Sequence, residues 1–271
     1  MIKRILLLST CLIASHVSAL DQNLITQQLD SQDYSARQQA RLDLKAALSE
    51  ATAPGAAADK LESLQNFLIA ESGGDLPLPE RLYLIRMLEL FGNAAAIEPL
   101  AELLDAEEVE VQDSAIRALA SVPGEEATRV LTDGLKTGND NQRIKYIKAL
   151  AYRGSSDSAP KIAESLESEN PQVVLSVLDA LIRIDNANVA PALESAADSA
   201  PDELKPVIEA ALLDLNPDGT TVDRLLDSGS NAGVRMAAFQ HVLSHDASKA
   251  EAHILKVLQD PDAPARSRLI D

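Results

Sequence analysis

The 271-residue sequence contains one cysteine, no tryptophan, four tyrosines and three phenylalanines. Sandwiches and barrels draw on aromatic and β-branched residues in alternating runs, and such runs are missing here. No stretch of about 18 consecutive apolar residues occurs either, which argues against a membrane-spanning helix. The single cysteine, Cys11, leaves the chain without an internal disulfide. These scarcities predict an all-α protein.

Basic residues are also scarce, since 24 Lys and Arg stand against 42 Asp and Glu and give a formal net charge of −18. A surface this negative repels nucleic acid and anionic membranes, so we expect no nucleic-acid partner. Hydrophobic residues, mostly Ala, Leu, Val and Ile, make up 46% of the chain. That fraction is sufficient for a continuous core, which argues against disorder as the main state.

The first 19 residues have the layout of a secretory signal peptide. Lys3 and Arg4 precede an apolar run over residues 5–14, and small residues end the segment at Ala19. The run is too short to span a bilayer, so we expect export to the periplasm or secretion without membrane insertion after cleavage. Cys11 follows only a few apolar residues, which favours cleavage over the alternative of lipid attachment there. The mature chain would then lack cysteine, which excludes thiol catalysis and thiolate metal sites.

Internal repetition dominates the remaining sequence. At a spacing of 31 residues, one column holds leucine in six consecutive units without an insertion. Its members are Leu88, Leu119, Leu150, Leu181, Leu212 and Leu243. The columns three and four residues earlier are mostly apolar too, and these spacings place the side chains on one stripe of a helix. Each unit is therefore predicted to open with an amphipathic helix, named helix A.

A second apolar column begins twelve residues after the first and predicts helix B of each unit. It contains Leu100, Leu131, Ile162, Leu193 and Leu255, with Leu225 one place out of register. Turn-forming residues such as Pro123-Gly124 and Gly154-Ser155 separate the two helices. A pair of short helices cannot bury its apolar faces alone, so neighbouring units are expected to stack into an α-solenoid.

The period, the two-helix unit and the run from Val111 to Leu119 resemble the HEAT repeat family, in its short bacterial form. The resemblance implies a scaffold fold that serves many unrelated activities. Tetratricopeptide repeats, the alternative, have a period of about 34 residues and aromatic positions that are absent here. Short HEAT repeats are also known from iron-dependent hydroxylases, whose His-Glu pairs this sequence lacks, and from bilin lyases, which an exported chain with few aromatic residues resembles poorly.

These patterns divide the chain into four parts. Residues 1–19 are the predicted signal peptide, and residues 20–77 an irregular helical cap with helices expected at 35–51 and 56–70. Residues 78–262 are six HEAT-like repeats. Residues 263–271 begin a seventh repeat that is not completed, which indicates either a frayed cap or a fragment of a longer protein.

Candidate metal ligands are few. His241 and His245 lie four residues apart on one predicted helix, and His253 lies on the next. A metal site needs at least three protein ligands with supporting contacts, so we interpret the pair as a polar helix end. The segments Asn139-Asp140-Asn141 and Asp260-Pro261-Asp262 lack the ligand spacing of a calcium loop. Motifs for phosphate binding, nucleophilic catalysis and dinucleotide binding are also missing, and we predict no catalytic residue, no metal and no cofactor.

The columns beside the apolar positions of helix B are acidic. They contain Glu98, Glu102, Asp105, Asp133, Glu164, Glu167, Glu194 and Asp198. The HEAT resemblance implies that the B helices line the concave side of the solenoid, so these carboxylates would form a ladder suited to a basic partner segment. The alternative interpretation is the solvated face of an acidic protein.

Helix A carries the opposite charge at Arg86, Arg117 and Lys148, which lie 31 residues apart. We expect Asp113, four residues before Arg117, to pair with that arginine within the helix. Together these observations predict an exported, non-enzymatic scaffold that binds a protein partner over an extended face. The alternative is the helical arm of a larger secreted enzyme whose catalytic domain lies outside this chain.

Overall fold

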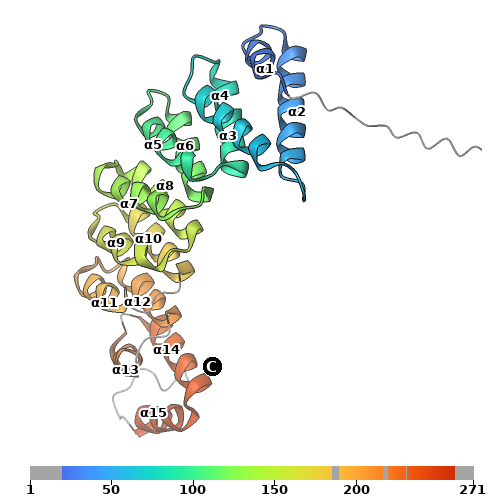
Figure 1. The fold of residues 1–271 in the computed structure, drawn as a ribbon. Coiled ribbons are helices and arrows are strands. Elements are labelled where there is room, and N and C mark those ends of the chain that lie inside the picture. The colour runs from blue at the N-terminus through green and yellow to red at the C-terminus, as the bar shows by residue number, and fades with distance from the viewer. Residues whose placement is uncertain (1–19, 185–188, 216–218, 230, 260–271) are drawn as a thin grey trace, which may run out of the picture. The chain divides into compact units, whose positions relative to one another are not determined.

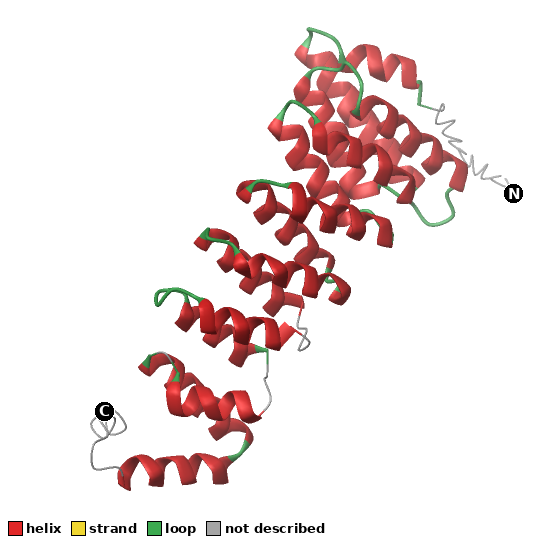
Figure 2. Cartoon of the chain, turned by 90° about the vertical axis from the view of Figure 1, so that its left-hand side faces the viewer, coloured by secondary structure: helices red, strands yellow, loops and turns green. Residues whose placement is uncertain are grey.

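The computed structural model describes residues 20–184, 189–215, 219–229 and 231–259. Every regular element in these ranges is a helix, and none of them contains a strand (Figure 2). The α-helices are α1 (Gln22–Leu29), α2 (Tyr34–Ala51), α3 (Ala58–Ser72), α4 (Leu78–Phe91), α5 (Ile97–Glu102), α6 (Val109–Ser121), α7 (Glu125–Thr137), α8 (Asp140–Arg153), α9 (Ala159–Ala163), α10 (Pro171–Ile184), α11 (Ala190–Ser199), α12 (Lys205–Asp214), α13 (Gly219–Ser228), α14 (Ala232–His245) and α15 (Ala247–Gln259). Four 3₁₀ segments join them: η1 (Ala94–Ala96), η2 (Leu103–Asp105), η3 (Ser156–Ser158) and η4 (Glu164–Glu167). The all-α prediction is confirmed.

Several predicted features lie outside the described residues. They are the signal peptide at 1–19 with Cys11, the Asp260-Pro261-Asp262 segment and the incomplete repeat at 263–271. The described part of the chain forms two compact units, of which the first extends to Leu84 and the second begins at Ile85. The boundary between them falls inside α4.

The first unit contains α1, α2, α3 and the start of α4. Helices α2 and α3 match the two segments expected from the sequence, whereas α1 was not predicted. It begins where the Asp21 carboxylate accepts a hydrogen bond from the Leu24 amide, and it buries Ile25 and Leu29, which lie four residues apart. The core of this unit is mostly aliphatic, with Leu29, Leu44, Leu48 and Leu68 fully buried and Phe67 of α3 buried among the leucines of the same helix.

A buried carboxylate ties α2 to the start of α4. Glu80 is only 1% exposed, and its two oxygens accept hydrogen bonds from Arg41 Nε at 2.8 Å and Nη2 at 2.9 Å. Arg37 Nε lies 3.3 Å from the same carboxylate. The Tyr83 hydroxyl donates to the Arg41 carbonyl at 2.8 Å, and burial raises the pKa of that phenol. A buried charge that loses its partners is strongly destabilising, so this cluster fixes one arrangement of the two helices.

Replacing Glu80→Gln removes the negative charge between two arginines while keeping the shape of the side chain. We expect the free energy of unfolding to fall by about 2 kcal/mol, because two partly buried guanidinium groups lose their counter-ion. Urea unfolding followed by circular dichroism measures this. Glu126→Gln, which removes a carboxylate from an exposed ion pair with Arg129, is the matched control and is expected to change nothing measurable.

The second unit is an α-solenoid of paired helices in two layers (Figure 1). Helices α6, α8, α10, α12 and α14 pack in succession and form the A layer. Helices α5, α7, α9, α11 and α13, with η2 and η4, form the B layer. Figure 1 shows α5, α7, α9 and α11 along one side of this unit and α6, α8, α10 and α12 along the other.

The repeat columns form the core of the second unit. Five of the six leucines of the helix A column are fully buried: Leu88, Leu119, Leu150, Leu181 and Leu212. The first four members of the helix B column are also fully buried: Leu100, Leu131, Ile162 and Leu193. The expectation is wrong in the sixth unit, where Leu243 is 52% and Leu255 is 50% exposed. There the buried stripe of α14 is Val234, Ala238 and Val242. Val242 is one residue before the predicted Leu243, so the helix is rotated by about 100° about its axis relative to the prediction.

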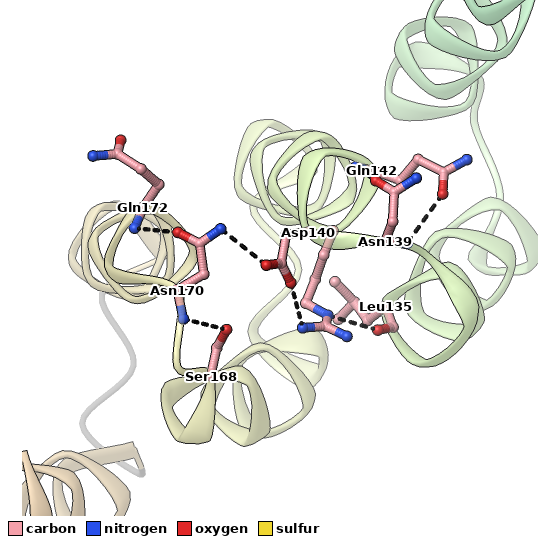
Figure 3. Close-up of polar contacts among 8 residues, drawn as sticks. Leu135, Asn139, Asp140, Gln142, Ser168, Asn170 and Gln172 are labelled. Atoms are coloured by element: carbon pink, nitrogen blue, oxygen red, sulfur yellow. Dashed lines mark hydrogen bonds and ion pairs between the residues drawn. The ribbon is translucent and has the colours of Figure 1, made fainter.

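Polar contacts fix neighbouring A-layer helices at their first turns (Figure 3). Asn139 and Gln142 form a capping box at the start of α8, and the Gln142 amide also donates to Gln112 Oε1 of α6 at 3.1 Å. On the other side, Asn170 Nδ2, which precedes α10, donates to Asp140 Oδ2 at 2.9 Å. The Asn139-Asp140 oxygens are therefore engaged in capping and in contacts between repeats.

Arg153 fixes the other end of α8 to its neighbour. Its guanidinium donates to the carbonyls of Leu119 at 2.8 Å, Val122 at 2.7 Å and Gly124 at 2.7 Å, and to Thr128 Oγ1 at 2.9 Å. These groups belong to the end of α6, the following turn and α7. The cation faces the carbonyl end of α6, where the helix dipole favours positive charge. Burial lowers the pKa of Arg153.

A glycine inside α7 makes room for an aromatic ring of α8. A Cβ atom on Gly134 would lie 2.5 Å from Tyr146 Cζ, far inside van der Waals contact. Tyr146 is buried at this point, and burial, with a smaller contribution from Asp105, raises the pKa of its hydroxyl. The absence of a side chain at this position therefore lets α7 and α8 pack closely.

Gly134→Ala tests this packing because two effects have opposite signs. Alanine in an exposed helix interior stabilises by about 1 kcal/mol relative to glycine, whereas overpacking a core costs about 1–3 kcal/mol. We expect a net loss of about 1–2 kcal/mol in the free energy of unfolding. In a Tyr146→Leu background the same change is expected to be neutral or stabilising. If Gly134→Ala stabilised the protein in the wild-type background, the close packing of Tyr146 against position 134 would be contradicted.

Candidate interaction surface

The structure places all eight acidic residues predicted as a binding surface on the B layer, and they are named the acidic surface here. Three lie on α5 and η2, one on α7, two on η4 and two on α11. These elements are contiguous, because α5 contacts α7, α7 contacts α9, and η4 contacts α11. Seven of the eight side chains are exposed, and Glu194 is half-buried.

Their positions relative to the core explain the exposure. An α-helix turns by about 100° per residue and a 3₁₀ helix by about 120°, so positions two before, two after and five after a buried residue lie about 140–220° away from it, on the opposite side. Counted from the buried column Leu100, Leu131, Ile162 and Leu193, the seven exposed acids occupy these positions: Glu98 the first, Glu102, Asp133 and Glu164 the second, and Asp105, Glu167 and Asp198 the third. The two later positions are therefore on the outer side of the layer, and each holds a carboxylate in three of the four repeats; Lys136 takes the third position in the second repeat and Ser195 the second position in the fourth.

Some members of the acidic surface are already paired. Lys136 Nζ lies 3.0 Å from Asp133 Oδ1, and Lys161 Nζ lies 2.7 Å from Glu164 Oε1. The Glu194 carboxylate accepts a hydrogen bond from the Thr221 hydroxyl of α13. Glu194 therefore joins two neighbouring repeats, which distinguishes it from the other seven.

The remaining five acids have no such contact. Within the described residues they make no hydrogen bond or ion pair through their side chains: Glu98, Glu102, Asp105, Glu167 and Asp198. Three of these carboxylates lie on the first repeat, and the other two lie on the adjacent third and fourth repeats. Such unpaired charges raise the local negative potential, which attracts a cationic partner and accelerates its association.

The two layers of the second unit differ in charge. The described helices of the B layer carry twelve acidic and four basic residues. Those of the A layer carry six acidic and eight basic residues. The excess of negative charge is thus concentrated on one layer.

The cationic column of helix A is exposed at Arg86, Arg117 and Lys148, as its spacing indicates. The ion pair expected between Asp113 and Arg117 is wrong. Asp113 pairs with Lys145 of α8, and Arg117 donates to the Ser114 hydroxyl at 2.9 Å. A contact between repeats replaces a contact within one helix because packing of α6 on α8 brings the lysine to the carboxylate.

The histidines at the end of α14 lie close together. The rings of His241 and His245 stack with centroids 4.3 Å apart, and His245 Nδ1 lies 2.8 Å from the His241 carbonyl oxygen. Burial and the neighbouring His245 ring lower the pKa of His241. His253 lies on α15 with its Nδ1 3.8 Å from Asp227. No group of three or more metal-ligating side chains gathers among the described residues.

Comparison with known families decides the classification. HEAT repeats match residues 74–144 and 135–213, which together span slightly more than half of the chain. The chain belongs to the HEAT repeat family. The matched HEAT repeats contain all eight residues of the acidic surface, and they include α5 to α11 in full. Among the described residues, no helix combines the length and the apolarity needed to span a bilayer.

Solved structures similar to this HEAT repeat chain include the complex of CpcE and CpcF of phycocyanin lyase from Nostoc sp. PCC7120. That match is 18% identical, covers 89% of this chain and 95% of the other, and has a TM-score of 0.44. Two engineered proteins are similar at 16% identity (88% and 67% covered, TM-score 0.40) and at 20% identity (86% and 96% covered, TM-score 0.36). None of them bears on function at such low identity. The comparison with curated proteins gave no match.

Unpaired like charges within one repeat, as at Glu98, Glu102 and Asp105, and on adjacent repeats, as at Glu167 and Asp198, predict a salt effect on stability. Packed helices lie about 8–10 Å apart, where two carboxylates repel by about 0.4 kcal/mol in water at low salt. Glu102→Gln, Glu167→Gln and Asp198→Asn together are expected to raise the thermal midpoint at 10 mM salt and to leave it unchanged at 1 M, where charges are screened beyond about 3 Å.

The control neutralises three exposed acids of the A layer, Glu110→Gln, Asp179→Asn and Asp214→Asn, where basic residues are interspersed. This variant is expected to show no gain at low salt. Equal salt dependence of both triple variants would show that the B-layer carboxylates do not repel one another.

Proposed function

We propose that the protein is an exported, non-enzymatic scaffold that binds a basic segment of a partner protein along the acidic surface. The observation that supports this proposal is the alignment of Glu102, Asp133 and Glu164 beside Asp105, Glu167 and Asp198 on the outer side of one contiguous layer. Export rests on the signal-like segment at residues 1–19, and the non-enzymatic role rests on the lack of catalytic motifs in the sequence.

The physical argument concerns spacing. Neighbouring B helices lie about 10 Å apart, which corresponds to about three residues of an extended peptide. A segment with a Lys or Arg at every third position or so can therefore meet a carboxylate of one column or the other in each of the four repeats that it crosses. Each exposed ion pair contributes little, so affinity would come from the sum over several repeats and from steering of the encounter.

The test is capture from a cell-envelope extract by the chain beginning at Leu20. The binding variant carries Glu98→Gln, Glu102→Gln, Glu164→Gln and Asp133→Asn, and the matched control carries Glu50→Gln, Glu110→Gln, Asp179→Asn and Asp214→Asn. Both lose four negative charges from exposed positions. We expect a partner with a basic segment to bind the wild type and the control, to be lost with the binding variant, and to dissociate as salt rises.

Equal loss of capture in both variants would contradict the proposal, because net charge would then matter and the acidic surface would not. Undiminished capture by both variants would also contradict it, because neither would then matter. Synthetic peptides from the basic segment of the captured protein, measured by fluorescence anisotropy, are expected to reproduce the difference between the two variants.

A further inference from the structure

A second surface lies on the A layer, away from the acidic surface. A hollow of about 430 Å³ opens between α6 and α8, with Glu89 of α4 at its edge. Its floor is apolar and formed by the buried side chains of Ile116, Ala120 and Ala149. Tyr152 stands at the rim and is 71% exposed, in a chain that has only seven phenylalanines and tyrosines. Alanines at the floor leave the space that larger side chains would fill.

The hollow is held open by contacts at both ends of its two helices. Near the N-terminal ends of the two helices, Gln142 donates to Gln112, and Lys145 pairs with Asp113. At the far end, Arg153 of α8 donates to the carbonyls of Leu119, in the last turn of α6, and of Val122, just after it. A surface that is fixed before binding loses less conformational entropy when a ligand binds, which favours affinity.

The charges around the hollow leave two cations without a carboxylate. Arg86 pairs with Glu89, and Lys145 pairs with Asp113, so both acids at the hollow are neutralised. Arg117 reaches only the Ser114 hydroxyl, and Lys148 makes no hydrogen bond or ion pair within the described residues. In a chain with a net charge of −18, two unpaired cations beside an apolar floor are a local exception.

We propose that this hollow binds an acidic peptide segment of a second partner protein. An apolar side chain of the peptide would occupy the space over Ala120 and Ala149 against the Tyr152 ring, and two carboxylates would meet Arg117 and Lys148. These cations lie on adjacent A helices, about 10 Å apart, so carboxylates about three residues apart in an extended peptide match them. Arg117 offers a planar pair of donors to a carboxylate, and Lys148 a point charge.

This surface is independent of the proposed function, since it lies on the other layer and selects a partner of opposite charge. An array of 12-residue peptides tests it. One set places two acidic residues three positions apart around a Leu or Phe, a second set replaces the acids with Gln or Asn, and a third replaces the apolar residue with Ser. The variant Arg117→Gln with Lys148→Gln is compared with a control, Arg183→Gln with Lys205→Gln, on α10 and α12 of the same layer.

We expect the first set alone to bind the wild type, with at least about tenfold weaker binding to the Arg117 and Lys148 double variant. The control and the quadruple variant of the acidic surface are expected to bind as the wild type does. Because the chain has no tryptophan, Tyr152→Trp places a single tryptophan at the rim, and its selectively excited emission is expected to shift when a peptide from the first set is added.

Four results would overturn the proposal. The first is equal binding of the acidic and the amide peptide sets, and the second is binding that survives the double variant. The third is binding of decanoate as tight as that of the peptides, which would indicate a small carboxylate as the ligand. The fourth is self-association that the double variant abolishes, which would indicate a second copy of this chain. Circular dichroism of each variant shows that loss of binding does not reflect loss of fold.

Discussion

The structure depends on the burial of small aliphatic side chains between neighbouring repeats. No disulfide, tryptophan or large aromatic core supports this chain, so packing of Leu and Ala on the next repeat must stabilise it. Each fully buried leucine contributes roughly 2 kcal/mol relative to an exposed one. Truncation to alanine costs more, since the repeats cannot close the cavity completely. The polar contacts that link α6, α8 and α10 then select one arrangement of the packed helices.

This packing also determines what the surface can do. Because the same two columns are buried in the first four repeats, the same outward positions recur there at 31-residue intervals, and a preference for one charge at such a position recurs with them. In the second unit the preference differs between the layers, with carboxylates on the B layer and a cationic column on the A layer. The chain thus presents two chemically distinct faces from one repeating core, which is how a scaffold can engage partners of opposite charge.

Most of the solenoid was predictable from sequence, because a repeated buried column is a strong periodic signal. Helix α1 was missed because its eight residues carry one weak signal, Ile25 and Leu29 four apart after a capping Asp21. The expected burial of Leu243 was wrong because α14 is rotated relative to the corresponding helices of the earlier repeats. Such a rotation leaves the leucine column of the sequence intact while a neighbouring stripe is buried instead. Neither error affects the repeats that carry the acidic surface.

The outward position of the acids also followed from the sequence, since a residue two or five positions from a buried leucine lies on the opposite side of the helix. Contacts between repeats were not predictable. The pairing of Asp113 with Lys145, the reach of Arg153 to the end of α6 and the half-burial of Glu194 depend on how the helices pack. The hollow between α6 and α8 likewise depends on how closely the side chains of the two helices approach each other. The repeat pattern of the sequence carries no information on that spacing.

Carboxyl-group footprinting of the chain with the proposed basic partner tests the central claim most directly. A carbodiimide and an amine label exposed Asp and Glu side chains, and mass spectrometry reports the labelling of each. The account predicts that the partner protects Glu102, Asp133, Glu164 and Glu167 while leaving Glu110, Asp179 and Asp214 of the A layer labelled as before. Protection of the A-layer carboxylates with unchanged labelling on the B layer would contradict it.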